Sequence, residues 1–224
     1  MSAVIFDIDH TLAIDNKLER VAFLHLLERI ATAGGHALGS LDEEIAAIDL
    51  LLAQQRSGAC TIDESVERFA FDRGVREFNA YPALYRALAL DMVDAFVVPA
   101  LDARSTLAEL AARGCALAIL SNGWNPLQAR KAQRVGFDGR IFASAELGLR
   151  KPDPRAFRAV LNALGVEASG AWYVGDDPHL DVPGALTAGM QVAWLDAQGA
   201  AYPTDVPEPS LRIGALADLL QVLR

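Results

Sequence analysis

Two aspartates stand two residues apart near the start of the chain, directly after a short apolar run. Asp7 and Asp9 follow Val4-Ile5-Phe6, and the hydroxyl of Thr11 comes two residues later. Carboxylates this close repel each other and are costly to bury unless a positive charge lies beside them. The motif therefore predicts a site at this point of the chain that needs a cation.

Polar residues also follow two apolar runs in the second half of the chain. Ser121 and Asn122 come after residues 115–120, and Asp176 comes after residues 172–174. Short apolar runs of this kind are typical of buried strands in a parallel sheet. Open α/β sheets bind ligands at the carboxyl ends of such strands. We therefore expect these polar residues and the first aspartates at one edge of a sheet.

The elements that would position these residues alternate from Pro99 onward. The pattern predicts helices at about 103–113, 126–135, 154–164, 183–188 and 213–223, with a loop at 203–209. Between them it predicts strands at about 115–120, 141–144, 172–174 and 191–195. Such alternation indicates a parallel sheet with right-handed crossovers. The fold class is therefore α/β, with a Rossmann-like three-layer core made of residues 1–14 and 99–224.

Residues 15–98 show helical periods without a convincing strand. The pattern predicts helices at 17–33, from Ser40, from Thr61 to about 73, and from Pro82 through Phe96. Ser40 with Glu43, and Thr61 with Glu64, have the spacing of capping boxes. We therefore expect residues 15–98 to form a helical bundle inserted into the α/β core.

Composition limits the classes of partner. The chain has 224 residues, 52% of them hydrophobic, which is ordinary for a folded protein. Its net charge of −9 argues against nucleic acid or an anionic membrane as the main partner. No signal sequence or long apolar run is present, and Cys60 and Cys115 lack metal-ligand spacing. These features predict a cytoplasmic protein with reduced thiols.

The motifs together resemble one enzyme family. They are, in chain order, Asp7-Ile8-Asp9-His10-Thr11, then Ser121, then Lys151-Pro152-Asp153-Pro154, then Gly175-Asp176-Asp177 with Asp181. This order resembles the haloacid dehalogenase-like (HAD) hydrolase superfamily, and the helical insertion is similar to that of its phosphoglycolate-phosphatase-like branch. The resemblance covers the whole predicted core, whereas the insertion matches in type and position only. It implies a HAD-like fold and a Mg²⁺-dependent phosphatase that acts on a small-molecule phosphate ester.

The resemblance also implies a role for each motif residue. Asp7 would be the nucleophile that forms an aspartyl-phosphate, and Asp9 would be the general acid and later the general base. Metal ligands would be Asp7, Asp176 and the main-chain carbonyl of Asp9. Lys151 would balance charge at the phosphate and at Asp7. The remaining expected roles are phosphate binding by Thr11, Ser121 and Asn122, and orientation of metal-bound waters or Lys151 by Asp177 and Asp181.

Several alternatives stay open at this point. A phosphomutase would share every core residue, and a catalytically silent binding module would need none of them. A 2-haloacid dehalogenase would use Asp7 to attack carbon, but it would need neither Mg²⁺ nor an acid at Asp9. Asp177 could simply begin the following helix, where acidic residues are favoured. The substrate and the choice between monomer and homodimer are not determined by the pattern.

Other residues are weaker candidates. His10 stands where many family members have Gly, and it could narrow the substrate side of the loop. His25 could reach the site from the insertion, and Trp124 and Asn125 could line it. His179 is expected at the surface. We also expect the insertion to close over the site, with hinges near residues 14–17 and 97–100.

Overall fold

The computed structural model describes residues 3–197 and 199–223. The chain divides into two compact units. An α/β unit runs to Asp15 and resumes at Val98, and a helical unit comprises Asn16–Val97. Each unit has its own buried core, and each is described here by itself.

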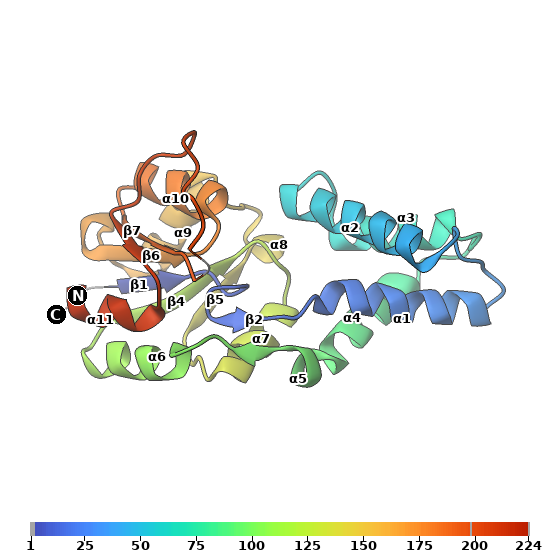
Figure 1. Cartoon of the computed structure of the whole chain (residues 1–224), viewed down its shortest axis with the longest axis horizontal. Helices are drawn as coiled ribbons and strands as arrows, with labels where there is room; N and C mark the ends of the chain where they lie inside the picture. The colour runs from blue at the N-terminus through green and yellow to red at the C-terminus, as the bar shows by residue number, and fades with distance from the viewer. Residues whose placement is uncertain (1–2, 198, 224) are drawn as a thin grey trace. The chain divides into compact units, whose positions relative to one another are not determined.

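The α/β unit is built on a six-stranded sheet (Figure 1). Its strands run in the order β5-β4-β1-β6-β7-β8, and all neighbours are parallel. β1 is completely buried, as expected for a strand covered on both faces. It lies in the middle of the sheet, between β4 and β6. The bounds are β1 Ala3–Phe6, β4 Ala116–Ser121, β5 Arg140–Ala143, β6 Ala171–Gly175, β7 Gln191–Leu195 and β8 Leu211–Ile213.

Helices cover both faces of this sheet and give the predicted three layers (Figure 1). One layer contains α6 (Ala103–Ala112), α7 (Leu127–Val135) and α11 (Leu219–Val222). The other contains α9 (Pro154–Leu164) and α10 (Pro178–Thr187). A short helix, α8 (Ser144–Leu147), follows β5. The predicted α/β fold class is therefore confirmed.

The helical unit contains α1 (Leu18–Thr32), α2 (Leu41–Ser57), α3 (Ile62–Asp72), α4 (Tyr81–Asp91) and α5 (Val93–Phe96). Both predicted capping boxes are present, at the start of α2 and of α3. An aromatic cluster lies in the core of this unit. The ring centroid of Phe23 is 4.9 Å from that of Phe69 and 4.5 Å from that of Tyr85.

A buried ion pair also stabilises the helical unit. The side chains of Arg73 and Glu44 are each only 1% exposed, and Arg73 Nε donates to Glu44 Oε2 at 3.1 Å. The guanidinium lies 3.4 Å from the ring centroid of Phe69 and donates to that residue's carbonyl oxygen at 2.8 Å. The second carboxylate oxygen of Glu44 accepts from the backbone N–H of Leu38 at 2.5 Å. Both charges are therefore paired and hydrogen-bonded, as buried charges must be.

The chain leaves and re-enters the α/β unit through two short strands. β2 (Ala13–Ile14) and β3 (Val98–Pro99) pair antiparallel, Ala13 with Pro99 and Ile14 with Val98. The two connections are therefore hydrogen-bonded neighbours.

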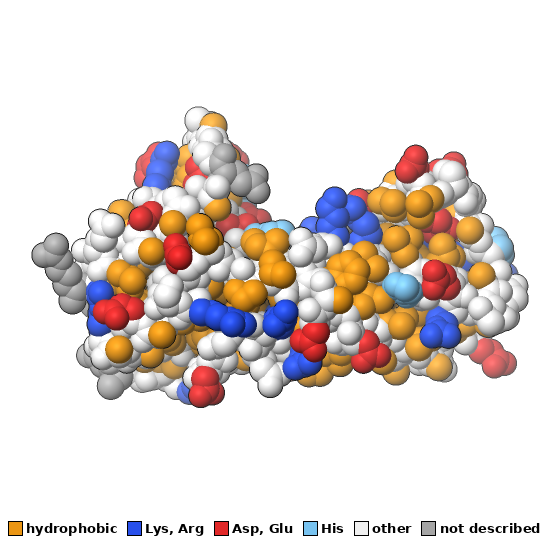
Figure 2. All heavy atoms as spheres, turned by 60° about the horizontal axis from the view of Figure 1, so that its bottom comes forward, with side chains coloured by type: hydrophobic (Ala, Val, Ile, Leu, Met, Phe, Trp, Pro, Cys, Tyr) orange, Lys and Arg blue, Asp and Glu red, His pale blue; other side chains and the backbone are white. Residues whose placement is uncertain are grey.

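The surface carries a mixture of side chains. On the face shown in Figure 2, Lys and Arg lie among acidic and hydrophobic residues and do not form one broad basic surface. None of the helices in the described part of the chain is long and apolar enough to cross a lipid bilayer.

The structure differs from the predicted elements in a few places. α10 begins at Pro178 and not near residue 183, because Asp177 caps it and Pro178 suits the first turn. The predicted helix at 213–223 is wrong in its first part, since residues 211–213 form β8 against β7. Pairing with a buried strand outweighs the helical pattern there. The fourth predicted helix ends at Asp91, and α5 is a separate turn; β2, β3 and α8 were not predicted.

Candidate active site

Three neighbouring strands bring the motif residues to one edge of the sheet. β1 leads directly into Asp7, β4 ends at Ser121, and β6 ends one residue before Asp176. The backbone N–H of Asp7 donates to the carbonyl of Val174 at 2.8 Å and so continues the pairing of β1 with β6. This arrangement places the ends of all three strands together, as parallel pairing requires.

A cluster of carboxylates lies at this edge. One oxygen each of Asp7, Asp176 and Asp181 lies within 4.8 Å of the others. Asp7 is 8% exposed and Asp181 is fully buried. Burial raises the pKa of Asp7 well above its usual range, and the nearby acidic groups raise it further against the opposing effect of Lys151. Burial and the charge of Asp181 raise the pKa of Asp176 to about 6.

This donor set fits a divalent metal ion. Hard oxygen ligands and an excess of negative charge are what Mg²⁺ prefers in proteins. Burial, and to a smaller extent the neighbouring acidic groups, raise the pKa of Asp7 and of Asp176, so a bound cation would favour their charged forms. Asp181 is close enough to join Asp7 and Asp176 in the set.

Lys151 supplies the positive charge beside Asp7. Its side chain is buried, and its Nζ lies 3.0 Å from Asp7 Oδ1 and 2.7 Å from Asp181 Oδ1. Burial alone would lower the pKa of Lys151, but the charges of Asp181 and Asp7 raise it above its usual value. The ammonium group is therefore charged at neutral pH.

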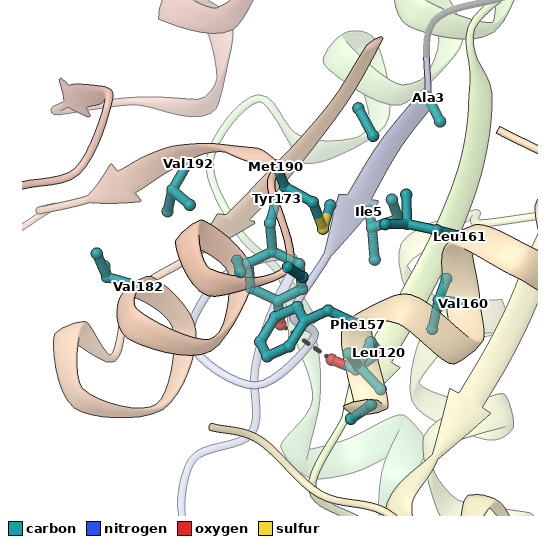
Figure 3. Packing of buried hydrophobic residues seen from close by; sticks show 14 of the residues in the cluster. Ala3, Ile5, Leu120, Phe157, Val160, Leu161, Tyr173, Val182, Met190 and Val192 are labelled. Atoms are coloured by element: carbon teal, nitrogen blue, oxygen red, sulfur yellow. Dashed lines mark hydrogen bonds between the residues drawn. The ribbon is translucent and has the colours of Figure 1, made fainter. Parts of the chain in front are cut away.

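Two residues hold Lys151 in place. The side chain of Asn122 donates to the Lys151 carbonyl and accepts from the Lys151 backbone N–H, both at 2.8 Å. Lys151 Nζ also donates to the phenolic oxygen of Tyr173 at 2.9 Å, and Tyr173 donates to the carbonyl of Leu120 at 3.1 Å. Figure 3 shows the latter bond, with Tyr173 packed against Phe157. The Asn122 amide therefore fixes the Lys151 backbone, and its predicted contact with phosphate stays a prediction.

Asp9 is held separately from the carboxylate cluster. Lys131 Nζ lies 2.5 Å from Asp9 Oδ1, and Gln128 Nε2 donates to Asp9 Oδ2 at 3.0 Å. Burial raises the pKa of Asp9, but the charge of Lys131 and the hydrogen bonds from Lys131 and Gln128 outweigh this and lower it. Each oxygen of Asp9 therefore accepts a hydrogen bond, as expected for an ionised carboxylate.

Sequence reasoning missed Lys131, Gln128 and Tyr173. The sequence did contain a signal for the first two, because their spacing places them on the same helical face as three apolar residues. The structure buries that face, which carries Leu127, Ala132 and Val135. Polar side chains three residues apart on the apolar face of a helix need buried partners. Tyr173 gave no such signal, since an aromatic residue is common in a buried strand.

The remaining motif residues contact the protein as follows. Thr11 is buried and donates to Asp176 Oδ1 at 3.1 Å, and Ser121 is buried at the end of β4. Asp177 Oδ1 accepts from the N–H groups of residues 179 and 180, so Asp177 is the N-cap of α10. Asp181 Oδ2 accepts from the Asp177 N–H at 3.0 Å. Phosphate contacts by Thr11 and Ser121 stay predictions.

The weaker candidates are also placed. His10 is exposed, and its φ of 60° is a left-handed conformation that glycine adopts without strain. His25 pairs with Glu28 at 3.1 Å in the helical unit. Trp124 is buried, the backbone N–H of Asn125 donates to Glu146, and His179 is exposed and lies 3.3 Å from Asp205.

Comparisons with known proteins agree with this geometry. A family model for haloacid dehalogenase-like hydrolases matches residues 1–189. Glyceraldehyde 3-phosphate phosphatase of Methanopyrus kandleri is 28% identical, with 100% of this chain and 97% of that protein covered. Phosphoserine phosphatase of Thermus thermophilus is 40% identical over 53% of this chain, and the match spans 48% of that protein's length. A crystal structure of a 2-haloacid dehalogenase from Pseudomonas syringae superposes with a TM-score of 0.76 and 25% identity, covering 100% of this chain and 98% of that one.

The carboxylate cluster and the buried lysine lie at the carboxyl edge of a parallel six-stranded sheet, where enzymes of the α/β class bind their ligands. The family model covers most of the chain, so the chain belongs to the haloacid dehalogenase-like hydrolases.

Proposed function

We propose that the protein is a Mg²⁺-dependent phosphatase that hydrolyses a small phosphorylated metabolite through an aspartyl-phosphate on Asp7. The observation that carries this proposal is the cluster of Asp7, Asp176 and Asp181 with Lys151 3.0 Å from Asp7. A nucleophilic carboxylate needs nearby positive charge when it attacks a phosphate dianion. Two relatives with phosphatase names support the same reaction class.

In the first step, a carboxylate oxygen of Asp7 attacks phosphorus, and the bond from phosphorus to the ester oxygen breaks. The electron pair of that bond goes to the leaving oxygen, which takes a proton from Asp9. Lys151 offsets charge at Asp7 and at the phosphoryl oxygens. Ser121 lies at the same edge, where its hydroxyl would donate to those oxygens. Thr11 would do the same when its hydroxyl proton turns from Asp176 to the phosphoryl group.

In the second step, a water oxygen attacks the phosphorus of the aspartyl-phosphate. Asp9 takes a proton from this water, and the bond between phosphorus and Asp7 breaks. Inorganic phosphate leaves, and the carboxylate of Asp7 is restored. Asp9 ends the step protonated and can return this proton to solvent, because its pKa is lowered in the free site. The negative charge of the next phosphate ester favours the protonated form that the first step requires.

The proposed metal site uses Asp7, Asp176 and the main-chain carbonyl of Asp9, with Asp181 beside them. When bound, Mg²⁺ would shield the negative charge between the nucleophile and the phosphoryl group. Thr11 orients Asp176, and Asp177 places Asp181 through its backbone N–H.

The same fold supports dehalogenation, as the Pseudomonas syringae structure shows. A dehalogenase would use Asp7 without a metal, and it would leave Asp9 and Asp176 without a chemical role. The buried partners of Asp9 and the carboxylate cluster favour the phosphatase. A phosphomutase would share these residues and would return the phosphoryl group to the substrate, so only product analysis separates it from a phosphatase.

We further propose that the helical unit, with its boundaries near residues 15 and 98, serves as the cap that selects the substrate. Phosphoserine and glyceraldehyde 3-phosphate, named for two relatives, are both three-carbon phosphate monoesters with an alkyl leaving group. We propose a substrate of this size, and a screen of two- to four-carbon phosphate esters tests the proposal. We also propose that the protein acts in the cytoplasm.

The experiment that tests the function is replacement of Asp7 by Asn. Wild-type protein with Mg²⁺ should release p-nitrophenol from p-nitrophenyl phosphate, and acid quenching should trap protein that carries one phosphoryl group, visible by mass spectrometry. Asp7→Asn should lose both signals. The exposed Asp138→Asn is the matched control and should keep both. Activity retained by Asp7→Asn would exclude Asp7 as the nucleophile.

A further inference from the structure

Lys131 is a buried cation that the chemistry above does not use. Its side chain is 1% exposed, and it lies on α7, outside all four motifs. A buried lysine is costly unless its charge is paired. Lys131 pairs with Asp9 at 2.5 Å and with Asp15 at 3.2 Å.

The contacts of Lys131 reach the aspartate that is proposed to move protons. The carboxylate of Asp9 receives Lys131 on Oδ1 and Gln128 on Oδ2, so its orientation is set by two donors on successive turns of one helix. Lys151 plays the corresponding part for Asp7. The site therefore contains two buried lysines: Lys151 pairs with Asp7, and Lys131 pairs with Asp9.

Asp15 connects this arrangement to the end of the α/β unit. It is the last residue before the helical unit, and it directly follows β2. α7 itself packs against β2 and β3, through which the chain leaves and returns. Lys131 therefore has Asp9 on one side and the end of the outgoing connection on the other.

We propose that Lys131 and Gln128 are positioning residues that orient the carboxylate of Asp9 for proton transfer, and that Asp15 holds Lys131 in place. This inference rests on the proposed function, in which Asp9 moves the proton. During catalysis the leaving oxygen, and later water, replaces Gln128 at Oδ2 while Lys131 keeps its bond to Oδ1. Without Lys131, Asp9 and Asp15 would be two partly buried acids without a shared cation.

The test uses substrates that differ in their need for a proton. p-Nitrophenyl phosphate has a good leaving group, whereas phenyl phosphate has a poor one and depends on general acid catalysis. The value of kcat/KM reports the steps through phosphorylation of Asp7, so it isolates the first proton transfer. General acid–base catalysis contributes about 10²- to 10⁴-fold, so Lys131→Met should lower kcat/KM for phenyl phosphate about tenfold or more and for p-nitrophenyl phosphate less than about threefold.

Matched variants separate positioning from a general structural defect. Lys131→Arg keeps the charge and should recover part of the loss on phenyl phosphate. Arg130→Met removes the adjacent cation of α7, which pairs with Gln133, and should leave both substrates unchanged. Gln128→Leu should show the same substrate dependence as Lys131→Met, to a smaller extent, and it serves as the test if Lys131→Met does not fold.

Equal losses on both substrates in Lys131→Met and Gln128→Leu would overturn the inference, since a smaller fraction of folded enzyme lowers both by one factor. Failure of the proposed function would look different. In that case wild-type protein would hydrolyse neither ester with Mg²⁺, or Asp7→Asn would keep the activity.

Discussion

Lys151 Nζ lies 2.9 Å from the phenolic oxygen of Tyr173, a residue on the strand that leads to Asp176. With Asp7 and Asp181, this contact gives each of the three ammonium protons an acceptor inside the protein. The lysine is therefore fixed by one neutral and two acidic partners before any substrate arrives. A phosphate must consequently compete with one of these partners for a proton of Lys151.

Replacing Tyr173 by Phe removes the neutral partner. The change also leaves the buried carbonyl of Leu120 without its side-chain donor, so we expect a loss of stability of about 1–2 kcal/mol. Lys151 should then give its third proton to phosphate more readily, so inhibition by inorganic phosphate should strengthen. Inhibition constants measured with Mg²⁺ check this. Tyr202→Phe, which loses an exposed bond to Pro207, is the control; equal inhibition constants in wild type and Tyr173→Phe would contradict the expectation.

Gly175 leaves room for the carboxylate of Asp181. A Cβ at this position would lie 2.1 Å from Asp181 Oδ2, so Gly175→Ala must displace that side chain. We expect Gly175→Ala to weaken Mg²⁺ activation at least tenfold, an order of magnitude in keeping with loss of partners around a metal site. Gly214→Ala is the matched control, because a Cβ there meets nothing within 4 Å. Titration of activity against Mg²⁺ concentration measures the effect, and identical curves for the two variants would refute it.

The contribution of Asp176 to the stability of the metal-free protein should fall as the pH rises from about 4 to about 6. Asp176 has a pKa of about 6 in the folded protein against an ordinary value of 3.8, so the folded state binds more protons than the unfolded state in this interval. The difference corresponds to an upper limit of about 3 kcal/mol. Asp176→Asn should remove this part of the pH dependence.

Mg²⁺ should reverse the loss, since it binds the deprotonated carboxylates of the folded state. Its effect on Tm should therefore be larger at about pH 7.5 than at about pH 5. Thermal unfolding with Mg²⁺ or a chelator, at both pH values, measures it. An equal increase in Tm at the two pH values, or an undiminished increase in Asp176→Asn, would show that the ion binds elsewhere.

The helical unit depends on a charge pair that solvent does not reach. Arg73→Met leaves the carboxylate of Glu44 buried without its cation, which should cost about 3–5 kcal/mol in the free energy of unfolding. Combining Arg73→Met with Glu44→Leu removes both charges and should recover most of this loss. Arg68→Met breaks an exposed pair with Asp72 and should cost less than about 1 kcal/mol. Urea unfolding followed by circular dichroism compares the three variants, and equal costs for the two single changes would contradict the role of burial.

Much of the fold follows from local patterns in the sequence. Capping boxes and apolar periods predicted α1 to α3, and apolar runs predicted β1, β4, β6 and β7. β8 was missed because residues 211–213 form a strand only through their pairing with β7, which no local pattern encodes. The start of α10 was missed because Pro183 looked like a first-turn proline, although it lies inside the helix.

The motif residues at the sheet edge were visible because chemistry restricts their types and because they end neighbouring strands. The partners of Asp9 were not visible in this way. Lys131 lies in the middle of α7 and Gln128 in its first turn, and only the fold brings them to a residue more than one hundred positions earlier. Tyr173 was not predicted for a different reason. Its ring packs in the hydrophobic core, and only its hydroxyl contacts the site, where it accepts a hydrogen bond from Lys151.

The paired strands β2 and β3 have a consequence for how such a protein can diversify. Because Ala13 pairs with Pro99 and Ile14 with Val98, the excursion of the chain through residues 16–97 starts and finishes on adjacent residues. We therefore expect that segments of other lengths can replace residues 16–97 without a shift of register in the six-stranded sheet. A chimera that carries the corresponding segment of the Methanopyrus kandleri relative should still hydrolyse p-nitrophenyl phosphate and should take over the preference of its donor, which a substrate panel would reveal. New substrate specificity would then arise by exchange of residues 16–97, while the catalytic residues of the α/β unit stay unchanged.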